Sequence, residues 1–347
     1  MERIAAVRTG QGEVKAVEQP MPVLGENQAL IRVHASLISP GTEMASVIQA
    51  RKTPDPKAEA KRFGYANSGV IEKIQGDPKG LKPGMRVFAM GAGFAEHTNW
   101  ACVPVNLVAP IPDSLSFERA CYACLAATAL QSVRRAELSF GEIGVVAGLG
   151  IVGNLAAQIS HLSGARVVGW DTLPFRLKAA LACGVPTVMN PKEEGTLENV
   201  RALAAPYGVE FSILAFGGDA TAAFESIRSC MRMSADGHVM GRVVLVGGCT
   251  VAFAGGAANG NLDLRASSRT GPGYHDSAYE HGRDYPAGFV PFTTQRNLLD
   301  MIRLIDEKRL VVDPMTTHRL PLAEVGRAAD ALIEAPDRSL GVILQMP

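Results

Sequence analysis

Residues 144–171, GVVAGLGIVGNLAAQISHLSGARVVGWD, most constrain the fold of this chain, because they predict a strand, a glycine turn, a helix and a second strand in succession. Gly148, Gly150 and Gly153 form a G-x-G-x-x-G pattern. The first glycine permits a tight turn, the second lets the backbone approach a pyrophosphate, and the third lets the helix pack closely on the strand. The N–H groups at the start of the helix then face the phosphates, so the stretch predicts a dinucleotide site.

Asp171 follows the second strand, close to the spacing of about 20 residues at which an acid holds the ribose hydroxyls. A carboxylate there repels the 2′-phosphate of NADP, and an arginine is normally needed to accept that phosphate. We therefore expect NAD as the cofactor, although Arg176 is near in the sequence. The residues predicted to bind the cofactor are Gly148, Leu149, Gly150, Ile151, Val152, Gly153, Asp171, Arg176, Thr128, Phe216, Gly217 and Gly247.

Charge and composition exclude several classes of partner. Lys plus Arg and Asp plus Glu both number 34, so no net field attracts nucleic acid or an anionic membrane. The first residues, MERIAAVRTG, match neither a secretory signal nor a lipidation motif, and no apolar run is long enough to span a bilayer. We expect a cytoplasmic protein that acts on a small molecule. Its 347 residues suit two domains.

The six cysteines are scattered through predicted helices and strands, which favours reduced thiols. Cys121 and Cys124 form a C-x-x-C within FERACYACLAATAL, whose small and apolar residues indicate a buried helix. We interpret them as a packed pair rather than a redox pair or a metal site.

The spacing of apolar residues and of Gly, Pro and Asn residues changes along the chain and divides it into two predicted domains. Residues 1–115 alternate short apolar runs with Gly, Pro and Asn, which predicts a β-rich domain. From Ser116, a predicted N-cap, helices and strands alternate through residues 116–270, which predicts a doubly wound α/β domain. Residues 254–288 are Gly-rich and too long for an ordinary connection, so we expect a functional lid, favoured by its tyrosines and histidines, or a disordered loop.

This domain order and several local motifs resemble the medium-chain dehydrogenase/reductase superfamily, of the zinc alcohol dehydrogenase type. SLISPGTE at 36–43, FGYANSGVI at 63–71, LKPGMRVF at 81–88, ATAL at 127–130 and THRLPLAE at 317–324 are similar to motifs of that superfamily. The resemblance implies a GroES-like β-barrel over residues 1–115, completed by 271–347. It also implies a Rossmann domain over 116–270 and substrate held in the cleft between the domains.

The chain departs from the zinc-binding members at the ligand positions. Pro40, Tyr65 and Ala66 stand where those members have Cys, His and Glu, and only Cys124 matches a ligand. The four-cysteine structural zinc lobe is also missing. One thiolate cannot hold zinc, which takes about four ligands, so we expect no metal.

Reduction of a carbonyl without a metal needs another group to polarise and protonate its oxygen. Tyr65, at a vacated ligand position, is either that donor or a packed aromatic residue. By resemblance, Thr42 is the hydroxyl that touches the substrate oxygen. By resemblance, Glu43 matches an acid that lies next to the zinc ligands without binding zinc itself. Here it either orients Tyr65, binds a substrate hydroxyl or caps the local turn.

Three further residues are predicted to bind substrate. His97 follows Glu96 in a segment similar to the A-E-Y strand of the superfamily, where either residue lines the cleft or pairs across the barrel. Tyr274 and His275 belong to the expected lid, and their neutral donors and acceptors suit a sugar.

The predicted function is an NAD(H)-dependent, zinc-independent oxidoreductase that interconverts a secondary alcohol and a ketone, on a sugar, polyol or related hydroxylated metabolite. An NADPH-dependent quinone or enoyl reductase and a nucleotide-binding protein without turnover are the alternatives. The resemblance also implies a homodimer or homotetramer, with residues 243–256, VVLVGGCTVAFAGG, as the edge at which subunits pair.

Overall fold

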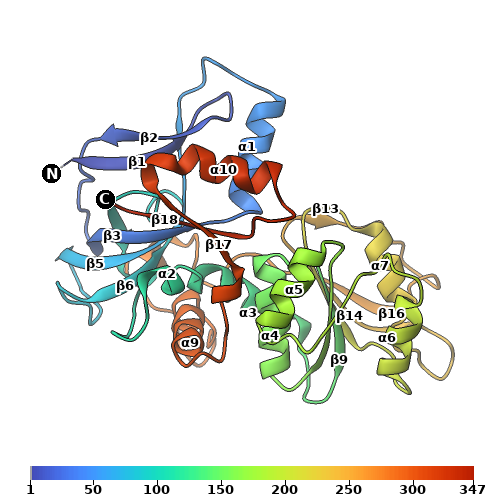
Figure 1. The fold of residues 1–347 in the computed structure, drawn as a ribbon. Coiled ribbons are helices and arrows are strands. Elements are labelled where there is room, and N and C mark those ends of the chain that lie inside the picture. The colour runs from blue at the N-terminus through green and yellow to red at the C-terminus, as the bar shows by residue number, and fades with distance from the viewer. Residues whose placement is uncertain (1) are drawn as a thin grey trace. The chain divides into compact units, whose positions relative to one another are not determined.

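The computed structural model describes residues 2–347, which form two compact units. Unit 1 contains the chain up to Ala127 together with Thr270–Pro347, and unit 2 is Thr128–Arg269. Both are mixed α/β or β-rich structures, as the sequence predicts, and Figure 1 shows the elements of each. Within residues 2–347, no helix combines the length and the apolar character that crossing a bilayer requires.

Unit 1 is built on a seven-stranded sheet that joins the two ends of the chain. Its strand order is β17-β18-β3-β5-β6-β8, and β7 also pairs with β3. The strands are β3 (Gln28–Ile38), β5 (Ala66–Gln75), β6 (Arg86–Met90), β7 (Trp100–Pro104), β8 (Val108–Pro110), β17 (Thr316–Pro321) and β18 (Gly341–Gln345). A smaller antiparallel sheet has the order β2-β1-β4, with β1 (Arg3–Arg8), β2 (Val14–Gln19) and β4 (Lys61–Arg62).

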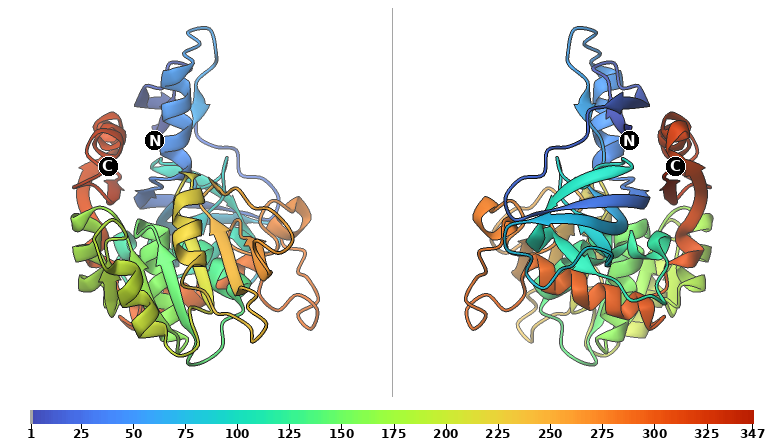
Figure 2. Two further views of the ribbon diagram at one scale, coloured as in Figure 1. Left: turned by 90° about the vertical axis from the view of Figure 1, so that its right-hand side faces the viewer. Right: turned by 90° about the vertical axis from the view of Figure 1, so that its left-hand side faces the viewer.

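The C-terminal segment completes the barrel because its apolar residues share a core with the N-terminal strands. Antiparallel pairing places Val342 opposite Ile38 and Leu344 opposite Ser36. Figure 2 shows the red C-terminal segment beside the blue N-terminal one. The helices of unit 1 are α1 (Thr42–Lys52), α2 (Phe117–Ala120), α8 (Ser277–Glu280), α9 (Thr294–Asp306), α10 (Val325–Glu334) and the first part of α3 (Ala123–Ala136). Ser116 caps α2, as predicted, by accepting a hydrogen bond from the Arg119 N–H.

Unit 2 contains a six-stranded parallel sheet of order β11-β10-β9-β12-β14-β16, which is the doubly wound order. Its strands are β9 (Ile143–Ala147), β10 (Arg166–Trp170), β11 (Thr187–Met189), β12 (Phe211–Ala215), β14 (Met240–Val246) and β16 (Asn261–Ala266). Its helices are α4 (Ile151–Leu162), α5 (Pro174–Ala182), α6 (Thr196–Ala204) and α7 (Thr221–Arg228), besides the last part of α3. A short ladder joins β13 (Gly218–Asp219) to β15 (Cys249–Thr250).

Two sequence interpretations of this region are wrong. Residues 254–288 are not one continuous loop, because they include strand β16 and helix α8. Residues 243–256 do not form a sheet edge, because β14 pairs with β12 on one side and β16 on the other. The strand at this edge of the sheet is β16, whose short and polar sequence, NLDLRA, gives only a weak strand pattern.

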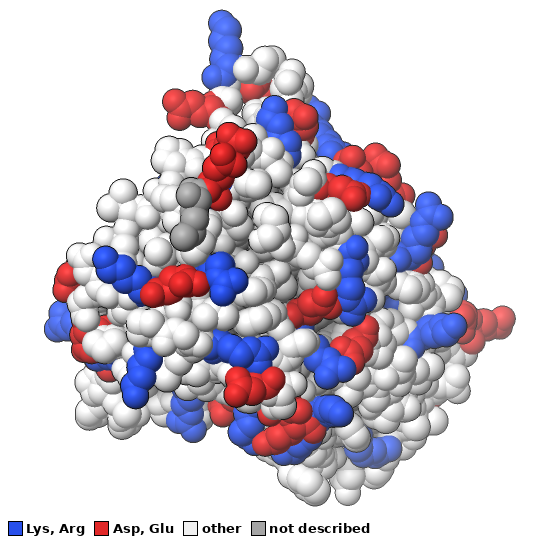
Figure 3. Space-filling model, turned by 60° about the vertical axis from the view of Figure 1, so that its left-hand side comes forward, with Lys and Arg blue, Asp and Glu red and all other residues white. Residues whose placement is uncertain are grey.

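The surface carries both signs of charge in alternation. On the face drawn in Figure 3, Lys and Arg side chains lie among Asp and Glu side chains over most of the visible surface. Exposed side chains of opposite charge form ion pairs, such as Arg32 with Glu72 at 2.7 Å. This distribution agrees with the balanced composition of the chain.

Candidate functional site

The glycine turn of unit 2 has the geometry that its three glycines require. Gly148 follows β9 with φ +87°, a conformation that favours glycine, and its N–H donates to the Trp170 carbonyl at 2.7 Å. At Gly153 in α4, a Cβ would lie 1.7 Å from the Gly148 carbonyl oxygen. At Gly150, the N-cap of α4, a Cβ would meet no atom within 4 Å. The turn therefore leaves open space at the N-terminus of α4, where a phosphate would bind.

The other predicted cofactor residues follow strands of the same sheet. Residue pairing places Trp170 and Leu214 on either side of Ala147, and Ala215 beside Val246. The carboxyl ends of β9, β10, β12 and β14 therefore lie at one edge of the sheet. The residues that follow them there are Gly148, Asp171, Phe216, Gly217 and Gly247. Strand order reverses between β9 and β12, which is where ligands bind in such sheets.

Asp171 connects the second strand to the glycine turn. Its Oδ2 accepts a hydrogen bond from the Leu149 N–H at 2.8 Å, and its Oδ1 accepts one from the Leu173 N–H at 2.9 Å. The Arg176 Nη1 lies 3.7 Å from Oδ2, and the Arg176 Nε is buried without a hydrogen-bond partner among residues 2–347. The carboxylate is thus held at the end of β10 with one guanidinium beside it.

Ile151 and Val152 start helix α4, and Thr128 lies on α3 where unit 2 begins. Ile151 is buried, whereas Val152 and Thr128 are half-buried. The backbone of Ile151 and Val152 belongs to the first turn of the helix, so its N–H groups are among those that face an anion at this end. The residues present fit a dinucleotide, and the contact of each one with the cofactor stays a prediction.

Tyr65 of unit 1 lies in the short connection between β4 and β5. Its hydroxyl belongs to a cluster of polar side chains. Burial of its hydroxyl raises the pKa of Tyr65 well above the usual value, and electrostatic interactions with Cys124 and Glu43 raise it further. Hydrogen bonds from Ser39 and Thr42 act in the opposite direction. The phenol therefore stays protonated across the neutral range, and it can donate a proton or a hydrogen bond.

Glu43, Ser36 and His97 form a buried hydrogen-bonded row. Glu43 lies in the first turn of α1, and its Oε2 is 2.9 Å from His97 Nε2. His97 Nδ1 is 2.8 Å from Ser36 Oγ. The His97 side chain is 0% exposed and that of Glu43 is 6% exposed.

This row favours one of the two interpretations of His97, pairing across the barrel, over binding of substrate in the cleft. His97 does not line an open cleft in this structure, because it is fully buried and both ring nitrogens are within hydrogen-bond distance of side chains of its own unit. Glu43 does not cap α1, since its Oε2 lies 2.9 Å from His97 Nε2 and its Oε1 has no hydrogen-bond partner among residues 2–347. Sequence analysis did not select Ser36 or Ser39, although both lie in the SLISPGTE motif that it identified.

Zinc does not fit the residues of this cluster. Pro40, Tyr65 and Ala66 offer no thiolate, imidazole or carboxylate, and burial, with a contribution from Glu43, raises the pKa of Cys124 to about 12. Among residues 2–347, no group of three His, Cys, Asp or Glu side chains could hold a metal ion. The side chains of Cys121 and Cys124 are buried and form no disulfide bond, which agrees with a packed pair.

Tyr274 and His275 lie on the loop before α8. The Tyr274 hydroxyl accepts a hydrogen bond from the Ala92 N–H at 3.0 Å, and its ring stacks on His275 with centroids 3.9 Å apart. His275 is exposed, with φ +71°. The barrel backbone therefore holds Tyr274, and substrate binding by this pair stays a prediction.

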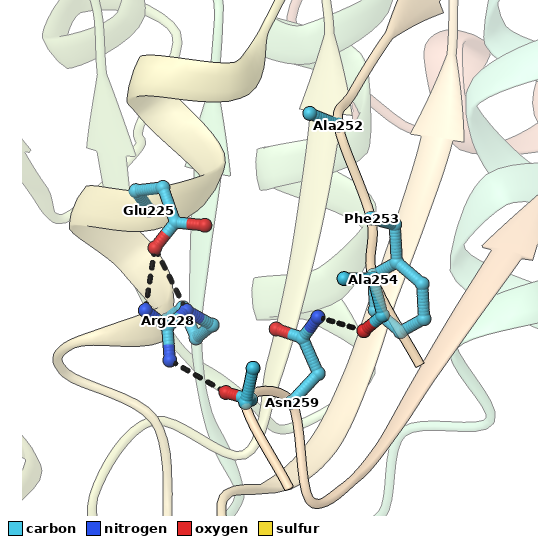
Figure 4. Close-up of a pocket in the computed structure, with 7 residues that line it drawn as sticks. Glu225, Arg228, Ala252, Phe253, Ala254 and Asn259 are labelled. Carbon is cyan, nitrogen blue, oxygen red and sulfur yellow. Dashed lines mark hydrogen bonds and ion pairs between the residues drawn. The ribbon is translucent and has the colours of Figure 1, made fainter. Parts of the chain in front are cut away.

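Unit 2 also has a surface hollow, and none of the residues that line it belongs to the clusters described above. Figure 4 shows Arg228 bound to Glu225 on α7, and Asn259 bound to the Ala254 carbonyl. Arg228 also donates to the Ala258 carbonyl at 2.9 Å. Because the polar groups that line this hollow bind one another, it lacks the convergent free donors of a ligand site.

Comparison with known proteins gives consistent results. Residues 152–271 match the family model for zinc-binding dehydrogenases. The chain is 26% identical over 266 residues to an alcohol dehydrogenase of Cupriavidus necator, covering 62% of this chain and 71% of that protein. It is 23% identical over 347 residues to sorbitol dehydrogenase of Homo sapiens, covering 92% of this chain and 89% of that protein. The alcohol dehydrogenase from Thermus sp. ATN1 has a similar fold, with a TM-score of 0.75 and 21% sequence identity. The similarity covers 99% of this chain and 100% of that one.

Proposed function

Because the chain belongs to the medium-chain dehydrogenase/reductase superfamily and is an NAD(P)-dependent oxidoreductase, we propose that it uses NAD(H), without zinc, to interconvert a secondary alcohol and a ketone. Its substrate is a sugar, polyol or related hydroxylated metabolite. The observation that carries the proposal is the position of Tyr65, a protonated phenol among Ser39, Thr42 and Glu43, at the place of a missing metal ligand.

The preference for NAD rests on Asp171. Its carboxylate ends the strand after the glycine turn, where it would repel a 2′-phosphate and accept the ribose hydroxyls. The Arg176 guanidinium lies 3.7 Å from this carboxylate and partly offsets its negative charge, but the carboxylate remains in place. Gly148, Leu149, Gly150, Ile151, Val152 and Gly153 would hold the pyrophosphate, beside Phe216, Gly217 and Gly247 at the ends of the neighbouring strands.

The residues of unit 1 perform the proton chemistry. A nicotinamide cofactor, held by the residues of the glycine turn, would supply hydride chemistry when bound. In the direction of reduction, Tyr65 donates its proton to the carbonyl oxygen as negative charge develops there. Thr42 and Ser39 donate hydrogen bonds to the phenol oxygen, which stabilises the phenolate that remains. Oxidation of the alcohol reverses these steps.

The hydroxylated substrate class rests on the chemistry of the site and on one relative. A sugar or polyol needs many neutral donors and acceptors, and the Tyr274 hydroxyl and the exposed His275 supply two of them. The human relative that spans nearly the whole chain is a sorbitol dehydrogenase.

The first test is a titration of purified, metal-analysed protein with NADH and NADPH, followed by nicotinamide fluorescence. We expect tight binding of NADH, weaker binding of NADPH and less than stoichiometric zinc. Stoichiometric zinc would refute the metal-free mechanism, and a clear preference for NADPH would refute the cofactor assignment. Turnover is then measured with NAD and a panel of sugars and polyols.

A further inference from the structure

Unit 2 has a second hollow, at the edge of the parallel sheet opposite the glycine turn. Ile143 and Arg166, the first residues of β9 and β10, line it together with Thr187, the first residue of β11. His161 near the end of α4 and Leu203 near the end of α6 also line it. The glycine turn follows the other end of β9, about 15 Å away at the usual rise per residue of a strand. The hollow is therefore separate from the predicted dinucleotide site.

Apolar side chains make up most of the lining of this second hollow. They are Ile143, Ala165, Val167, Val168, Pro186 and Leu203. The volume is about 230 Å³, below the range of roughly 300–1,000 Å³ that is usual for the sites of drug-sized ligands. The hollow therefore suits the apolar part of a small molecule, such as one aromatic ring.

Three polar side chains of this hollow have hydrogen-bond donors without a partner in the described chain. Arg166 donates from Nη2 to the Leu203 carbonyl at 2.8 Å, and its other guanidinium nitrogens have no partner among residues 2–347. The His161 ring and the Thr187 hydroxyl form no hydrogen bond or ion pair within the same residues. The hollow of Figure 4 differs, because a carboxylate there binds its arginine.

The acceptors around the second hollow already have partners. The carbonyl groups at the end of α4, which would otherwise favour a cation, accept the backbone N–H groups of residues 163–165. Glu142 Oε1 lies 2.6 Å from Arg242 Nη2, and Glu210 Oε2 accepts the N–H of the first residue of β9 at 3.1 Å. The positive charge of Arg166 is therefore not paired with a carboxylate among residues 2–347.

We propose that this hollow binds a small organic anion in which a carboxylate is joined to an apolar body. The carboxylate pairs with the Arg166 guanidinium, and His161 and Thr187 are further donors beside it. The apolar body covers Val167 and Val168 on β10. Non-covalent contacts alone hold the anion, and its binding does not depend on the proposed redox function.

Benzoate and benzyl alcohol contain the same ring and differ in charge, so together they test the contribution of Arg166. In calorimetric titrations we expect benzoate to bind about 10- to 100-fold more tightly, the effect of hydrogen bonds to a charged group. Arg166→Gln keeps a polar side chain but removes the charge. In this variant the affinity for benzoate should fall to within about threefold of that for benzyl alcohol.

Arg228→Gln is the matched control, because it makes the same substitution in the hollow of Figure 4 and should leave the affinity for benzoate unchanged. The wild-type protein gives a second readout, the NMR signals of its histidine rings. The signal of His161 should shift on titration with benzoate, whereas that of the buried His97 should not. The His161→Asn variant identifies the first of these signals.

Equal affinities for benzoate and benzyl alcohol, no binding of either, or a preference for benzoate that Arg166→Gln leaves unchanged would overturn the proposal. Displacement of benzoate by NADH would place the anion at the glycine turn and would also overturn it. Failure to bind NADH would count against the proposed function, and the benzoate comparison would still decide the role of Arg166. A preference for benzoate that depends on Arg166, with a shift of the His161 signal, supports the proposal.

Discussion

Gly153 packs so closely on Gly148 that a methyl group at residue 153 would lie 1.7 Å from the Gly148 carbonyl oxygen. The first atom that it would meet is backbone, so the clash cannot be relieved by a side-chain rotation. We expect Gly153→Ala to displace the start of α4, to lower the free energy of unfolding by about 1–3 kcal/mol and to weaken NADH binding. Chemical denaturation and fluorescence titration measure the two effects.

Gly150→Ala is the matched control for this change, because a Cβ there meets no atom within 4 Å and the backbone φ is −60°. The variant should keep the stability of the wild type. We expect it nevertheless to weaken NADH binding, since the methyl group enters the space predicted for the pyrophosphate. Unchanged NADH affinity in Gly150→Ala would contradict the predicted position of the cofactor.

Asp171→Asn tests the preference for NAD. The amide keeps the size of the side chain but has one acceptor oxygen and no charge, so NADH binding should weaken by about tenfold and NADPH binding should weaken less or improve. The measurement is the ratio of the two dissociation constants. A ratio equal to that of the wild type would show that Asp171 does not choose the cofactor. Arg176→Ala, which removes the neighbouring guanidinium, is expected to favour NADH further.

Tyr65→Phe removes only the hydroxyl that the mechanism uses. We expect kcat to fall by about 10²- to 10⁴-fold, the usual contribution of a positioned acid. Thr42→Ala should give a smaller loss, because Ser39 still donates to the phenol oxygen. Far-UV circular dichroism and thermal unfolding serve as the folding control. Turnover near the wild-type value in both variants would show that the proton comes from elsewhere.

Because of Cys124, we expect the free energy of unfolding to change with pH in the alkaline range. Burial raises the pKa of this thiol from 9.0 to about 12, so the folded protein retains a proton that the unfolded chain loses in this interval. The free energy of unfolding should therefore fall as the pH rises from about 9 to about 12, by at most about 1.4 kcal/mol per pH unit for this group. Denaturant titrations at several pH values measure the slope, and Cys124→Ala should reduce it. An identical slope in the two proteins would be inconsistent with a buried, protonated thiol.

Sequence patterns predicted the local elements of the dinucleotide half with few errors. The helix expected after the glycine turn is α4 (Ile151–Leu162), and the strands expected on either side of it are β9 (Ile143–Ala147) and β10 (Arg166–Trp170). The Ser116 cap was also confirmed. These features are local, because glycine conformations, capping side chains and the 3.6-residue apolar period depend on neighbours along the chain.

The errors concern features that depend on distant residues. The sequence around residues 254–288 has many glycines, but strand β16 forms there because β14 offers it an open edge. For His97 the sequence left two interpretations open, a residue of the cleft or one that pairs across the barrel, since an isolated histidine in a polar segment gives no sign of what will cover it. Its burial is decided by Phe63, Gly64 and Glu43, which other elements of unit 1 bring to it.

The sequence by itself therefore determined the α/β class, the glycine turn, the acid after the second strand and the loss of the zinc ligands, since each depends on residue type and spacing. Only the tertiary structure decided that Glu43 has one paired and one unpaired oxygen and that Ser36 orients His97. Ser36 and His97 are 61 residues apart in the chain. Hydrogen bonds at such separations depend on strand register and packing, which no local pattern encodes.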